Sequence, residues 1–157
     1  MIQRGNRCKI MSTRWMLVSE AWNLNEIARK VGDVLTALTL LKFVKIKGLT
    51  ISEDEEELRK RIIAVKPVLW DLLKEIENTI KSGYGPPPLV RVLQEEYGYA
   101  DLKKVQEKIK NAIDALERIG RGDYREDDFE ELERLLECIA YEASSRSQEL
   151  ITRAGRY

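Results

Sequence analysis

Apolar residues recur at every third or fourth position along most of this chain. The clearest series, in the first third, comprises Leu17, Ala21, Leu24, Ala28, Val31, Leu35, Leu38 and Leu41. Such spacing is typical of the buried stripe of an amphipathic helix, so the pattern predicts one long helix over residues 12–45. Its second half, residues 34–44, is apolar almost all round and must be covered on more than one side. It is therefore either a central helix or a seam between copies.

The same period continues beyond this helix. Pro67 falls inside the second series and predicts a kink, because proline lacks the backbone N–H and clashes with the preceding turn. Capping signals are Ser52 with Glu55, Asp101, and Asp123 with Glu126. Residues 84–88 (Tyr-Gly-Pro-Pro-Pro) predict a rigid extended corner. Further helices are expected over residues 53–82, 88–97, 101–119 and 124–153, with no segment alternating as a strand does. The fold class is therefore all-α, an antiparallel bundle of four or five helices.

Charge is distributed unevenly along the 157 residues. Residues 1–50 hold nine basic and three acidic side chains, a net charge of +6, whereas residues 51–157 carry a net charge of −6. Four basic residues precede Glu20, the first acidic one: Arg4, Arg7, Lys9 and Arg14. We expect residues 1–11 to form a flexible basic arm ahead of a single domain over residues 12–157.

Composition excludes several classes of site. The chain has no histidine, which removes Ser-His-Asp and Cys-His chemistry and histidine-bearing zinc sites. Cys8 and Cys138 are its only cysteines, and no secretory signal precedes the first helix, so we expect a reduced, cytoplasmic protein. No apolar run reaches the length of a membrane span, and we expect no membrane partner. Abundant Lys, Arg and Glu favour a thermophilic source.

Paired carboxylates are the remaining route to catalysis. Some all-α nucleotide hydrolases hold Mg²⁺ with a Glu-x-x-Glu pair followed on the next helix by Glu-x-x-Asp. Glu53 and Glu56 match the first half, but the second half is missing, and Asp71 lies about four turns along the same predicted helix. A carboxylate-metal hydrolase is therefore the last alternative, and we expect neither a metal nor a cofactor.

Trp15, Val18 and Trp22 form a second apolar edge on the first helix, beside the stripe that begins at Leu17. Tryptophan is enriched in the energetic centres of protein interfaces. The sequence thus favours a non-enzymatic helical interaction or scaffold module that self-associates or is a subunit of a larger complex. The pattern leaves open that both tryptophans are core residues of a closed monomer.

Nucleic-acid binding is the first alternative function. Its candidate residues are Arg4, Arg7, Lys9, Arg14, Arg153 and Arg156, which would contact phosphates. The isoelectric point near 6.4 and the absence of a known nucleic-acid-binding motif argue against a dedicated binder.

Overall fold

The computed structural model describes residues 2–45 and 54–157, with side chains from Thr13 onward. Its described part consists of helices without strands: α1 (Ile2–Lys45), α2 (Glu55–Ile63), α3 (Lys66–Ser82), α4 (Pro88–Tyr97), α5 (Leu102–Arg121) and α6 (Glu126–Ala154). With α2 and α3 counted as one broken helix there are five. The predicted all-α bundle is confirmed.

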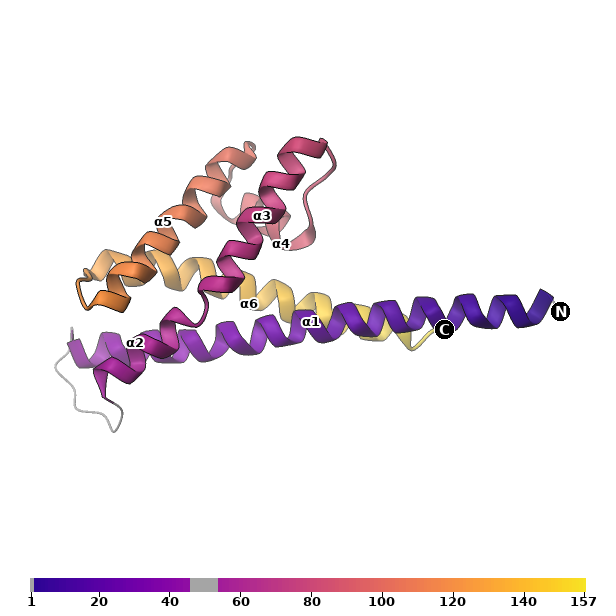
Figure 1. Ribbon diagram of the computed structural model, residues 1–157, viewed down its shortest axis with the longest axis horizontal. Helices are drawn as coiled ribbons and strands as arrows, with labels where there is room; N and C mark the ends of the chain where they lie inside the picture. The colour runs from indigo at the N-terminus through magenta and orange to yellow at the C-terminus, as the bar shows by residue number, and fades with distance from the viewer. Residues whose placement is uncertain (1, 46–53) are drawn as a thin grey trace.

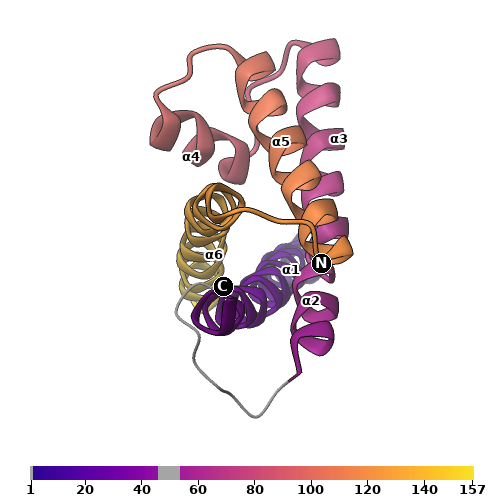
Figure 2. The ribbon, with the colours of Figure 1, turned by 90° about the vertical axis from the view of Figure 1, so that its left-hand side faces the viewer.

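The two longest helices, α1 and α6, lie side by side and antiparallel, and we call this pair the stem (Figures 1 and 2). Helices α2 to α5 form a lobe on one side of it. Within the lobe, α3 packs on α5. The lobe contacts the stem through α4, which packs on α6, and through α2, which lies on the C-terminal part of α1.

Two hydrogen bonds set the register of the stem. The Arg14 Nε donates to the carbonyl of Ala154 over 3.2 Å, and the Ser147 hydroxyl donates to the carbonyl of Ala21 over 2.8 Å. Helix α6 therefore ends at the level of Arg14. The backbone of α1 before this residue projects beyond α6, as Figure 1 shows.

The apolar second half of α1 is covered within the chain. Val34, Ala37, Leu38 and Leu41 are buried, and α2 and α6 both pack on α1. Of the two predicted explanations, the central helix is confirmed. This stretch consequently provides no argument for a second copy.

The long helix begins earlier than the pattern predicts. Helix α1 starts at Ile2 and passes through residue 12 without a break, so the predicted start at residue 12 is wrong. The pattern missed these turns because apolar periodicity reports burial, and α6 does not reach them. The side chains of residues 1–12 lie outside the described residues, so the flexible arm stays a prediction.

The predicted helix over residues 53–82 is two helices. The helix is interrupted between Ile63 and Lys66, and Pro67 lies in the first turn of α3. Proline is tolerated there because first-turn N–H groups have no intrahelical acceptor. The predicted disruption of this helix at Pro67 is therefore confirmed, and it takes the form of a break, with proline in the first turn of a new helix.

Of the three predicted N-terminal caps, the one at Asp101 is confirmed. The Asp101 carboxylate accepts from the backbone N–H of Lys103 over 3.0 Å, as expected. Ser52 lies outside the described residues, and Asp54 caps α2 by accepting from Glu56 N–H. The Asp123 cap is wrong, because α6 begins at Glu126 with Arg125 in the capping position.

Candidate functional site

Trp15, Val18 and Trp22 lie on one side of α1 and are exposed; we call them the tryptophan face. Their exposed fractions are 72% for Trp15, 40% for Val18 and 68% for Trp22. Seven residues separate the tryptophans, so they lie two turns or roughly 10 Å apart along the helix axis. The open alternative that both tryptophans are core residues does not hold within this chain.

The tryptophan face turns away from the other helices of the chain. On α1, Ala21 is buried against α6, and a helical wheel puts Trp22 about 100° and Trp15 about 120° away from it, with Val18 about 60° away. Glu20, Asn23 and Ile27 lie at other positions around α1, where they line a groove with Pro87 and Leu89 near the start of α4. Neither α6 nor the lobe therefore covers this face.

Two further apolar side chains near this level were missed by the sequence pattern. Ile151 of α6 is 57% exposed, and the stem register places it at the level of Leu17 and Val18. Met16 is also exposed but points about 100° away from Trp15 around the helix. Only the antiparallel register brings Ile151 to this level, so sequence spacing alone could not find it.

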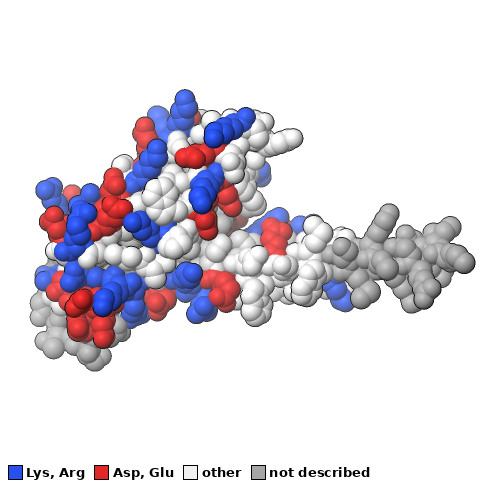
Figure 3. All heavy atoms as spheres, in the orientation of Figure 1, with Lys and Arg blue, Asp and Glu red and all other residues white. Residues whose placement is uncertain are grey.

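The described basic residues at the two ends of the chain lie near each other. The hydrogen bond from Arg14 to Ala154 brings Arg14 close to the C-terminal arginines, Arg153 and Arg156, which are exposed. The side chains of Arg4, Arg7 and Lys9 lie outside the described residues. Elsewhere, charges of both signs intermingle over the lobe (Figure 3).

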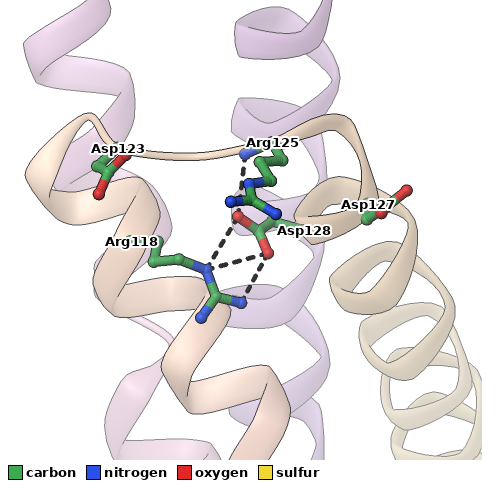
Figure 4. A pocket seen from close by; sticks show the side chains of 5 residues that line it. All are labelled: Arg118, Asp123, Arg125, Asp127 and Asp128. Carbon is green, nitrogen blue, oxygen red and sulfur yellow. Dashed lines mark hydrogen bonds and ion pairs between the residues drawn. The ribbon is translucent and has the colours of Figure 1, made fainter.

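A hollow at the turn between α5 and α6 is built around an ion pair (Figure 4). The Arg118 guanidinium donates to both oxygens of the buried Asp128 carboxylate, with a shortest distance of 2.7 Å. Asp128 also accepts from the backbone N–H of Arg125 over 3.0 Å. Both interactions hold the pKa of Asp128 below its usual range, Arg118 being the larger cause. The pair joins α5 to α6, and each of its charges is balanced by the other. Its role is therefore structural, and we call it the clamp.

A second hollow, beside α4, contains an aromatic ring between two cations. The Tyr97 ring lies 5.0 Å from the Lys108 ammonium and 4.5 Å from the Arg134 guanidinium, measured to the ring centroid. Burial raises the pKa of the Tyr97 hydroxyl to about 12. Nearby, burial raises the pKa of the Cys138 thiol to about 11. Neither group is poised as a nucleophile or base near neutral pH.

The candidate metal ligands do not come together in the described residues. Glu56 lies on α2 and pairs with Lys60, Asp71 lies on α3, and Glu53 lies outside the described residues. Across the described ranges, no three acidic or cysteine side chains form a group that could hold a metal ion. Within the same ranges, none of the helices has both the length and the apolarity needed to cross a bilayer.

Comparison of this chain with protein-family models, with curated proteins and with solved structures finds no match.

Proposed function

We propose that this protein is a non-enzymatic helical interaction module that self-associates through the tryptophan face. One observation carries the proposal: Trp15 and Trp22 are both about 70% exposed on the same side of α1, turned away from every other described helix. Large apolar side chains grouped on a surface mark interaction sites, and tryptophan contributes most where it becomes fully desolvated.

The first test removes the face and measures association. The double variant Trp15→Ala/Trp22→Ala is compared with the natural chain by size-exclusion chromatography with light scattering over a range of concentrations. The natural chain should show a mass above the 18.2 kDa of one chain, and the double variant should remain at 18.2 kDa. Because both side chains are exposed, their removal should leave the helices of the lobe and the packed part of the stem folded, as circular dichroism will check.

Trp70 provides the matched control. It lies on α3 in the lobe and is 47% exposed, so Trp70→Ala removes an exposed tryptophan away from the stem. This variant should associate as the natural chain does. Equal loss of association in both variants would mean that exposed tryptophans cause non-specific aggregation, which would contradict the proposal.

Nucleic-acid binding is a second candidate, favoured by the proximity of Arg14 to Arg153 and Arg156 at one end of the stem. Phosphate contacts predict affinity that falls steeply with salt. Fluorescence anisotropy with labelled oligonucleotides at two salt concentrations tests this. Arg153→Ala/Arg156→Ala should weaken binding, whereas Arg121→Ala, at the far end of α5, should not. Absence of salt-dependent binding would eliminate this candidate.

A further inference from the structure

A two-fold axis can relate the tryptophans of two copies of the tryptophan face. Trp15 and Trp22 are equidistant from a point between Val18 and Ser19. A two-fold axis through this point, perpendicular to α1, would place Trp15 of one copy opposite Trp22 of the other. Contacts of this kind, in which the same patch is used by both copies, are the commonest arrangement in homodimers.

We infer that the occupant of the tryptophan face is a second copy of this chain, with the two α1 helices packed antiparallel about that axis. This inference rests on the proposed function and adds the geometry of the pair. The apolar anchors meet at the centre of such an interface, Trp15 against Trp22 on each side of Val18.

The projecting end of α1 supports the antiparallel arrangement. Residues 2–13 extend roughly 18 Å beyond the end of α6 at 1.5 Å per residue. A helical segment of this length is marginal in water without a neighbour to pack on. In the antiparallel dimer, residues 2–13 of one copy run beside residues 24–35 of the other. Each projecting end thereby acquires a neighbouring helix.

Charge repulsion between the basic ends favours the same arrangement over a parallel one. The sequence of residues 2–13 contains three basic residues and no acidic one. Residues 24–35, which would lie beside it, contain two acidic residues, Glu26 and Asp33, and two basic ones, Arg29 and Lys30, so this segment is neutral overall. A parallel pairing would instead align one basic end with the other, and like charges repel.

The area that a stable dimer requires also favours an interface that includes the projecting turns of α1. Such an interface buries about 800 Å² on each partner. Two tryptophans that are about 70% exposed supply roughly 100–175 Å² each, which is less than half of this amount. The remaining area must come from adjoining surface, and the projecting turns of α1 are the nearest such surface along the helix.

Spin labels at two positions on one edge of α1 distinguish the possible arrangements. Ser19→Cys and Lys30→Cys are prepared separately in the full chain after Cys8→Ser and Cys138→Ala, and both labelled positions are exposed. In the antiparallel dimer, the two labels at Ser19 lie close together near the axis. The two labels at Lys30 are separated by roughly 35 Å along the helix, since each is 11.5 residues from the axis at 1.5 Å per residue.

Each outcome of the pulsed dipolar measurement decides between arrangements. A short distance at Ser19 with a long one at Lys30, both lost in the Trp15→Ala/Trp22→Ala background, is the expected result. Equal short distances at both positions would mean a parallel dimer, which overturns this inference but leaves the proposed function standing. Signals that survive the double substitution would place the interface elsewhere, and the absence of any intermolecular signal would overturn both.

Discussion

At the scale of single residues, Asp128 is the charged side chain that is buried among the described residues. It is buried, it receives a bidentate contact from Arg118, and it accepts from the Arg125 N–H. Because Arg118 is 39% exposed, solvent screens part of the attraction, and the contribution of the pair to stability is modest.

The lowered pKa of Asp128 makes stability depend on pH. A carboxyl with a lower pKa in the folded state than in the unfolded state stabilises the fold above its unfolded pKa, near 4. This contribution should be lost as the pH falls from about 4 through the folded pKa. Asp128→Asn should lower the free energy of unfolding by about 1–2 kcal/mol at neutral pH. It should also reduce the fall in stability below a pH of about 4, which we call the acid limb of the stability profile.

Urea unfolding at several pH values measures both effects. Asp127→Asn is the matched control, since Asp127 is an exposed neighbour in the same turn of α6. An unchanged acid limb in Asp128→Asn would contradict the role assigned to the clamp.

Sequence spacing predicted some of the exposed and paired residues and missed others. The wheel positions of Trp15, Val18 and Trp22 separated them from the buried stripe, and the structure exposes all three. Ile151 could not be placed beside them from its spacing, because its level depends on the antiparallel register of two helices distant in sequence. Arg125 and Asp128 were missed because a partner 10 residues away on another helix, Arg118, determines which carboxylate is buried.

At the scale of elements, helix ends and breaks follow local chemistry. Gly83, Gly98 and Gly122 end α3, α4 and α5 in the left-handed conformation, which glycine adopts without steric cost. The break before α3 could not be distinguished from a kink by sequence, since proline is compatible with either a bent helix or a first turn. Packing of α2 on α1 and of α3 on α5 decides between them.

Two glycines in helical segments should respond oppositely to alanine. Gly32, within α1, has no heavy atom within 4 Å of an added Cβ, so Gly32→Ala should stabilise the protein by about 1 kcal/mol. Gly122 has a φ of +78°, and an added Cβ would lie 3.0 Å from Arg59 Nη1, so Gly122→Ala should destabilise it by about 1–2 kcal/mol.

Thermal unfolding of the two alanine variants beside the natural chain checks this pair. A loss of stability in Gly32→Ala would mean that the outer side of α1 at this level is covered more tightly than the single chain indicates. A neutral Gly122→Ala would contradict the left-handed end of α5.

At the scale of the whole molecule, the fold separates a stem from a lobe. The lobe surface in Figure 3 carries intermingled charges of both signs, whereas the stem presents two exposed tryptophans at the end where α1 outruns α6. The core, including the apolar second half of α1, closes within one chain. Association is therefore expected to join folded monomers, with any gain in helical content confined to the projecting turns of residues 2–13.

Sedimentation equilibrium of the natural chain across a wide concentration range tests the central claim most directly. A reversible change from 18.2 kDa to twice that mass is expected as concentration rises, and this change should be absent in Trp15→Ala/Trp22→Ala. A single species of 18.2 kDa at every concentration would contradict self-association through the tryptophan face.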